Sequence, residues 1–220
     1  MQKFKGLRQA SHFGPTLIVT AIAFVFGTYY WWEGPAYVIA FTVALGQLVV
    51  GWSNDLHDYT DDLAHNRTNK PLVSGLITPK YLTKWLRFMV PFSFIANLLG
   101  PLGIKGGLVY MLGIACGVAY NFYFKFSALS PLPYAIAFAA LPSSVALSKD
   151  VTPPVWMWLG GALFGMAAHF INVIKDMEQD QASGIKGLPQ RLGTKKSILV
   201  AALLIVTGCT VVVQLFDLGL

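Results

Sequence analysis

Charged residues are scarce in this sequence. Only 12% of the 220 residues are charged, whereas an average soluble protein carries about 25%. Hydrophobic residues make up 55% of the chain, and the charges are clustered, which leaves long stretches uncharged. This composition excludes an ordinary soluble domain and indicates a polytopic membrane protein. We expect one bundle, since no domain boundary is visible.

Cysteine is also scarce, and no patch suited to nucleic acid is present. The two cysteines, Cys116 and Cys209, both lie in apolar runs, so the chain offers neither a disulfide framework nor a zinc-binding spacing. The net charge is +6, but no soluble module carries a basic patch. We therefore assign the excess of Lys and Arg to the positive-inside rule and predict no nucleic-acid partner.

Long uncharged runs are abundant, and they predict an all-α transmembrane bundle. A helix needs roughly 20 apolar residues to cross the hydrocarbon core, and seven runs approach or reach that length. Between the first two runs, Glu33 and Gly34-Pro35 predict a tight turn. The seven runs are Gly14–Trp32, Gly34–Asn54, Phe88–Ile104, Gly106–Phe124, Phe126–Ser148, Val151–Ile174 and Ser197–Phe216.

The distribution of Lys and Arg predicts the orientation in the membrane. With seven spans, 14 of the 16 basic residues fall on the side of the N-terminus, and only Lys105 and Lys149 fall on the other. This bias predicts a cytoplasmic N-terminus. Two acidic stretches end the second and the sixth span, so both are expected on that same cytoplasmic side.

Each acidic stretch has the pattern Asn-x-x-x-Asp-x-x-x-Asp. On a helix, residues four apart share one face, so each stretch predicts one row of oxygen atoms. The two stretches hold seven of the ten acidic residues, and such a concentration calls for a cation. Mg²⁺ prefers carboxylate oxygens and completes its shell with water and substrate phosphates. The predicted Mg²⁺ ligands are Asn54, Asp58, Asp62, Asn172, Asp176 and Asp180.

Basic residues near the stretches are candidates for binding a diphosphate, because their cations complement phosphate oxygens. Arg67 and Lys70 follow the first stretch, and Lys186 and Arg191 follow the second. Lys125 ends the fourth run at the same level, where it is either a diphosphate ligand or an interfacial anchor. Four other lysines are assigned to flanking positive charge: Lys80, Lys84, Lys195 and Lys196.

These motifs resemble those of the UbiA family of intramembrane aromatic prenyltransferases. The first stretch, Asn54-Asp55-x-x-Asp58-x-x-x-Asp62, is similar to the family's first aspartate-rich motif, and Arg67-x-x-Lys70-Pro71-Leu72-Val73-Ser74-Gly75 is similar to its continuation. The second stretch, followed by Gly184-Ile185-Lys186-x-Leu188-Pro189-x-Arg191-Leu192-Gly193, resembles the family's second site. The resemblance covers most of the chain in order and predicts a single UbiA-like domain over residues 1–220.

The chain departs from the resembled family in two respects. Nine spans are usual in the family and seven are counted here, so about two helices are expected to be missing after Leu220. Some members also have a Tyr four residues before the lysine that ends the fourth span, where this chain has Asn121.

The resemblance implies an Mg²⁺-dependent enzyme that moves an isoprenyl group from a polyprenyl diphosphate to a lipophilic, aromatic acceptor. Mg²⁺ and basic groups would neutralise the diphosphate while its carbon–oxygen bond ionises. Asp58, Asp62, Asp176 and Asp180 would be the catalytic carboxylates, with Asp58 or Asp62 accepting the proton that the acceptor releases. Further candidates for residues lining the acceptor cavity are His169, Tyr120 and Tyr123.

Other functions remain compatible with the same residues. The prenyl cation could cyclise, as in a terpene cyclase, or the donor could be phosphoribosyl diphosphate and the acceptor a lipid phosphate. A cation transporter would place ionisable residues deep in the spans, but here the charges gather at one end. A fragment that only binds lipid is the last alternative. The three enzymes would all release diphosphate, so the organic product distinguishes among them.

Overall fold

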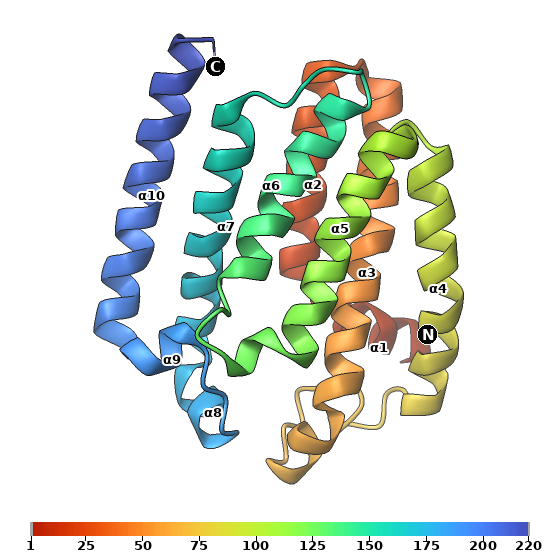
Figure 1. The fold of residues 1–220 in the computed structure, drawn as a ribbon. Coiled ribbons are helices and arrows are strands. Elements are labelled where there is room, and N and C mark those ends of the chain that lie inside the picture. The colour runs from red at the N-terminus through yellow and green to blue at the C-terminus, as the bar shows by residue number, and fades with distance from the viewer. Residues whose placement is uncertain (1, 220) are drawn as a thin grey trace.

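Seven long helices lie side by side in one bundle in the computed structural model, which describes residues 2–219 (Figure 1). Each long helix packs against the next along the chain, and α10 packs at the edge of the bundle against α7. The helices are α1 (Gln2–Ala10), α2 (Phe13–Tyr30), α3 (Glu33–Ala64), α4 (Pro79–Leu99), α5 (Gly103–Phe122), the 3₁₀ turn η1 (Phe124–Phe126), α6 (Leu132–Leu147), α7 (Val155–Lys175), α8 (Met177–Ala182), α9 (Leu188–Leu192) and α10 (Thr194–Asp217).

The all-α prediction is confirmed, and the seven predicted runs correspond in order to α2 to α7 and α10. Five of these helices are long and apolar enough to cross a membrane: α2, α3, α5, α7 and α10. Helix α6 is shorter, with 16 residues, and the first turns of α4 carry Lys80, Lys84 and Arg87. The predicted tight turn is also present, because α2 ends at Tyr30 and α3 begins at Glu33.

The start of α6 differs from the prediction. The fifth apolar run begins at Phe126, but the helix begins only at Leu132. Between them the chain turns repeatedly, and the Ser127 hydroxyl accepts a hydrogen bond from the Leu129 amide at 3.2 Å. Pro131 then precedes the first helical residue, where its fixed φ suits helix initiation and its missing amide proton costs nothing. Hydrophobicity alone therefore overestimates the length of this helix.

Two glycines bring α7 close to α6. A methyl group on Gly161 would meet the carbonyl oxygen of Phe138, and one on Gly165 would meet that of Tyr134, both well inside normal contact distance. Small residues allow helix backbones to approach closely in a membrane. This close packing places His169, one turn after Gly165, against the aromatic side chains of α5 and α6.

Helix α1 is an element that the sequence interpretation did not foresee. It packs beside α3, where the Trp52 indole donates a hydrogen bond to the Leu7 carbonyl at 3.0 Å. The chain then turns at His12, which adopts a left-handed conformation with φ 50°. The turn directs the chain into α2 and brings the His12 side chain to the acidic stretch of α3.

Candidate active site

The first acidic stretch lies on the last turns of α3, which is continuous through all three residues of its row. Asn54, Asp58 and Asp62 therefore share one face of a single helix, as the spacing predicts. The Asn54 amide donates a hydrogen bond to Asp58 Oδ2 at 2.9 Å. In this arrangement Asn54 orients the Asp58 carboxylate.

Three of the predicted diphosphate ligands lie against carboxylates of this stretch. Lys70 Nζ is 2.9 Å from Asp55 Oδ1, Arg67 Nη1 is 2.8 Å from Asp62 Oδ1, and the buried ammonium of Lys125 pairs with Asp58. Burial alone would lower the pKa of Lys70, but the charges of Asp55, Asp62 and Asp58 raise it. Cations from the loop after α3 and from η1 thus neutralise the carboxylates of the first stretch.

The second acidic stretch is less regular. Helix α7 ends at Lys175, Asp176 lies at the junction, and α8 begins at Met177. The row from Asn172 to Asp180 therefore crosses a helix break and does not form one straight face, which differs from the prediction. Asn172 and Asp176 are exposed, so water stabilises the polar groups at this break.

Asp180 is the most enclosed carboxylate of the second stretch. Its Oδ2 accepts a hydrogen bond from the Gln190 amide at 2.8 Å. Burial, together with the charge of Asp176, raises the pKa of Asp180 to about 6, although Gln190, Arg67 and Lys125 act in the opposite direction. A carboxylate with this raised pKa is under-compensated, so an added cation would be favoured beside it.

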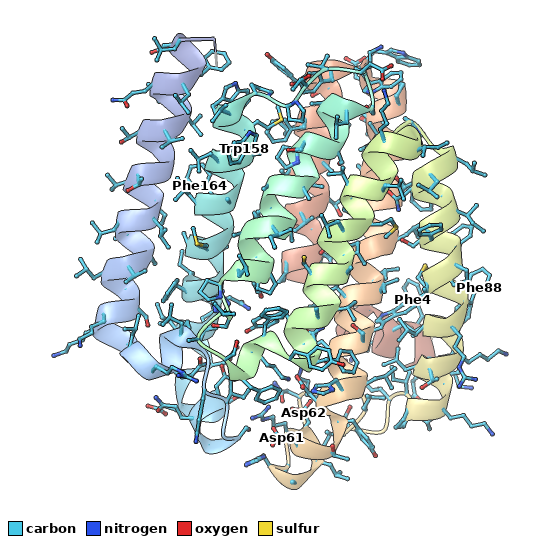
Figure 2. The ribbon with its side chains drawn as sticks, viewed as in Figure 1. Phe4, Asp61, Asp62, Phe88, Trp158 and Phe164 are labelled. Atoms are coloured by element: carbon cyan, nitrogen blue, oxygen red, sulfur yellow. The ribbon has the colours of Figure 1, made fainter. Side chains whose placement is uncertain are left out.

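Arg67 joins the two stretches. Its Nη2 donates a hydrogen bond to the Ser183 hydroxyl at 2.7 Å, while its Nη1 contacts Asp62. Ser183 in turn donates to Asp61 Oδ2 at 2.8 Å. Both stretches consequently meet at the same end of the bundle, where Figure 2 shows Asp61 and Asp62.

An aromatic cluster lies between the two stretches. The Tyr120 ring is 5.1 Å from Tyr134 and 5.4 Å from His169, in edge-to-face arrangements. Tyr120 lies in the last turn of α5, which packs against α3, and His169 lies three residues before Asn172 of the second stretch. Tyr123, by contrast, is 73% exposed and lies outside this cluster. Of the three predicted cavity residues, the structure thus brings Tyr120 and His169 together.

Ser130 connects this cluster to the segment after the second stretch. His169 Nε2 lies 3.0 Å from the Ser130 hydroxyl oxygen, which also accepts a hydrogen bond from the Leu188 amide at 2.9 Å. Asn121, which stands four residues before Lys125, donates a hydrogen bond from its amide to the Val50 carbonyl of α3 at 3.2 Å. Asn121 therefore fixes α5 against α3.

Two predicted diphosphate ligands lie apart from the carboxylates. Lys186 and Arg191 are exposed, and Arg191 Nε donates to the backbone carbonyl of Lys186 at 2.7 Å. Sequence reasoning missed His12, whose Nε2 is 3.0 Å from the buried Asp55, and it missed the bridging Ser183. The Asn54-Asp55 pair is the only signal in the sequence that could have drawn attention to Asp55.

The donor set suits a hard cation, although the residues are not gathered around one point. Carboxylate and amide oxygens from α3 and from α7 to α8 are the ligand type that Mg²⁺ prefers. Among residues 2–219, no three His, Cys, Asp or Glu side chains converge closely enough to hold a metal ion. Residues Asp58 and Asp62 are occupied by ion pairs instead.

The order of these elements matches a known family. A model of the UbiA prenyltransferase family matches residues 12–220. The chain belongs to the UbiA prenyltransferase family. Its apolar helices and its match to this family agree with a multi-pass integral membrane protein.

Curated UbiA relatives differ in what they make. Digeranylgeranylglyceryl phosphate synthase of Natronomonas pharaonis is 27% identical over 172 residues, which are 74% of this chain and 60% of the relative. 4-Hydroxybenzoate octaprenyltransferase of Saccharophagus degradans is 29% identical over 155 residues, 68% of this chain and 51% of the relative. The chain thus spans about 60% or less of the length of these two relatives.

Solved structures share the UbiA fold at low identity. A structure of digeranylgeranylglyceryl phosphate synthase has a TM-score of 0.74 and 19% identity, and the match covers 100% of this chain and 79% of that one. A UbiA homologue from Archaeoglobus fulgidus bound to GPP and Mg²⁺ also has a TM-score of 0.74, with 15% identity and coverage of 99% and 78%.

Proposed function

We propose that this protein is an Mg²⁺-dependent intramembrane prenyltransferase, which transfers an isoprenyl group from a polyprenyl diphosphate to a lipophilic acceptor. The observation that carries the proposal is the meeting of two acidic stretches at one end of the bundle, joined by Arg67. Carboxylates, cations and an aromatic cluster lie together there. The UbiA homologue bound to GPP and Mg²⁺ supports the same donor class.

The carboxylates and the cations would exchange partners when the donor binds. Asp58, Asp62, Asp176 and Asp180 would hold Mg²⁺, which supplies charge neutralisation of the diphosphate. Lys125, released from Asp58, would then donate to a phosphate oxygen. Arg67 and Lys70 would do the same from the loop after α3. Their ion pairs with the first stretch keep these cations close to the place where the diphosphate would bind.

The proposed reaction has two steps, in which the donor first ionises and the acceptor then attacks the cation. The carbon–oxygen bond of the donor breaks, and its electron pair leaves with the diphosphate. Tyr120 and Tyr134 would offer ring faces to the allylic cation. The acceptor's nucleophilic atom then forms the new bond to carbon, and its proton passes to whichever of Asp58 and Asp62 does not hold the metal at that moment. We also propose that the acidic stretches face the cytoplasm, because basic residues predominate at that end.

Diphosphate release by the purified full chain tests this proposal. Geranyl, farnesyl and geranylgeranyl diphosphate would be offered in nanodiscs with and without Mg²⁺. We expect Mg²⁺-dependent release that is lost in Asp58→Asn and in Asp176→Asn. Glu178→Gln is the matched control, because Glu178 is exposed and lies in the second stretch but outside its row.

Product analysis then separates the acceptors. Release without an organic transfer product would favour cyclisation, whereas transfer to an aromatic or to a glycerol phosphate lipid would identify the acceptor class. If folded protein releases diphosphate from none of the three donors, the prenyltransferase proposal is wrong.

A further inference from the structure

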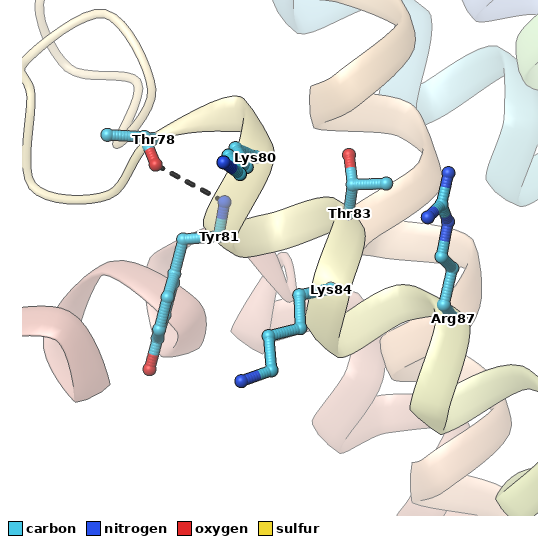
Figure 3. A pocket seen from close by; sticks show the side chains of 6 residues that line it. All are labelled: Thr78, Lys80, Tyr81, Thr83, Lys84 and Arg87. Atoms are coloured by element: carbon cyan, nitrogen blue, oxygen red, sulfur yellow. Dashed lines mark hydrogen bonds between the residues drawn. The ribbon is translucent and has the colours of Figure 1, made fainter.

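The first turns of α4 carry a basic face that the proposed reaction does not use. Lys80, Lys84 and Arg87 follow one another at intervals of four and three residues, so they lie on one side of the helix. Together with Thr78, Tyr81 and Thr83 they line a shallow groove of about 690 Å³ (Figure 3). The Thr78 hydroxyl caps the helix by accepting a hydrogen bond from the Tyr81 amide at 3.2 Å.

This basic face lacks a compensating carboxylate. None of its three cations forms an ion pair within the described residues, although Lys70, Arg67 and Lys125 all do. The sequence contains no Asp or Glu between Asp62 and Asp150. An anion from outside the chain would therefore meet uncompensated positive charge on α4.

An aromatic ladder continues from the basic face along α4. Tyr81 and Trp85 have ring centroids 6.3 Å apart, Trp85 and Phe88 6.1 Å, and Phe88 and Phe92 5.5 Å. Phe88 is 55% exposed, and Figure 2 shows it at the outer side of α4. The ladder runs beside the basic residues from Tyr81 and extends past Arg87, which gives α4 an apolar outer surface.

Helix α1 adds charge and apolar surface to the same corner. It lies against the segment before α4, where Gly6 contacts Ile77, and its Lys3 Nζ is 5.1 Å from the Tyr81 ring centroid. Phe4 is 74% exposed beside it. A short basic helix with an exposed aromatic side chain is typical of an element at a membrane interface.

We infer that the start of α4, together with α1, binds the headgroup of an anionic phospholipid. Lys80, Lys84 and Arg87 would contact the lipid phosphate, and an acyl chain would lie along the aromatic ladder. Clustered cations beside a membrane attract anionic lipids, and the continuous apolar surface selects a lipid over a soluble anion. This inference does not depend on the proposed transferase activity.

Two matched pairs of lysines test the site. Lys80→Gln with Lys84→Gln removes two charges from α4, and Lys195→Gln with Lys196→Gln removes two exposed charges from the first turn of α10. Native mass spectrometry would measure the retention of phosphatidylglycerol against phosphatidylcholine by each purified protein. We expect the α4 variant to bind phosphatidylglycerol roughly 25-fold more weakly, at about fivefold for each lysine. The α10 variant should stay within twofold of wild type.

A second arm distinguishes a lipid from a free phosphate. Soluble glycerol 3-phosphate should leave the melting temperature of the wild type unchanged, whereas phosphatidylglycerol should raise it. The rise with phosphatidylglycerol should be smaller in Phe88→Ser than in the wild type. Equal loss of lipid in the two lysine variants would mean diffuse charge attraction and would overturn the inference. A full shift with glycerol 3-phosphate would overturn it as well.

Discussion

The two acidic stretches share a spacing but differ in their surroundings. On α3 the row lies on one continuous helix, with Asp62 2% exposed and paired with Arg67. At the junction of α7 and α8 the row crosses a helix break, Asp176 is exposed, and Asp180 lies near a like charge. Each carboxylate of the first stretch therefore has a cationic partner within the fold. Among the described residues, no carboxylate of the second stretch forms an ion pair.

The largest expected effect concerns Lys125, which balances the first stretch. In Lys125→Met the side chain keeps its length and loses its charge, so Asp58 loses its cation and the diphosphate loses a donor. We expect the rate of diphosphate release to fall roughly 100-fold or more. Lys196→Met, an exposed lysine on α10, is the control and should stay within twofold. Equal effects of the two variants would show that Lys125 contributes only general positive charge.

Thermal unfolding in detergent with EDTA should separate the stretches directly. Asp62→Asn leaves Arg67 without its buried partner and should cost about 1–3 kcal/mol of unfolding free energy. Asp180→Asn should instead be neutral or stabilising at pH 7.5 by up to about 1 kcal/mol, because burial disfavours the charge it removes. A large destabilisation by both variants would contradict the contrast between balanced and unbalanced charge.

The effect of Asp180→Asn on the melting temperature should depend on pH, which gives a second test of the difference between the two stretches. The pKa of Asp180 is about 6 in the folded protein against an ordinary value of 3.8, so the folded state holds the proton more tightly. The contribution of Asp180 to the stability of the wild type should therefore fall as the pH rises from about 4 to 6 and change no further above that range. The difference in melting temperature between Asp180→Asn and wild type should be present at pH 7.5 and vanish near pH 4.

A smaller effect is expected from Arg67→Lys. This variant keeps the positive charge between the two stretches but removes the guanidinium group, whose two nitrogens contact Asp62 and Ser183. Lysine cannot contact Asp62 and Ser183 with two fixed donors. We expect the donor KM to rise about tenfold with a smaller change in kcat. Ser183→Ala removes the other half of the bridge and should move KM in the same direction. An unchanged KM in both variants would show that the contact between Arg67 and Ser183 does not contribute to donor binding.

The smallest effect concerns the aromatic cluster between the stretches. Tyr120→Phe removes a hydroxyl from this cluster and should lower kcat about two- to fivefold, less than the loss of a full hydrogen-bond donor to an oxyanion. Tyr123→Phe changes an exposed residue and should leave kcat unchanged. Steady-state kinetics with one donor compares them, and equal rates for the two variants would argue against a role of Tyr120 in the reaction.

The number and order of the long helices could be predicted from the sequence alone. Uncharged runs such as Gly34–Asn54 correspond to α3 because a backbone in hydrocarbon must form its own hydrogen bonds. The four-residue spacing also placed Asn54, Asp58 and Asp62 on one face, because helix periodicity is a local property. The segment at Phe126 was predicted wrongly as helix, since hydrophobicity does not reveal where a turn precedes Pro131.

Tertiary structure decided which charges neutralise which. In the first row, Asp58 contacts Asn54, four positions away in the chain, and Lys125, 67 positions away. No spacing rule predicts contacts between residues so far apart in sequence. His12 reaches Asp55 only because α1 packs beside Trp52 and the chain turns there. Local periodicity fixes which side chains share a face. Packing of helices distant in sequence fixes which faces meet, and the electrostatics of the site depends on that meeting.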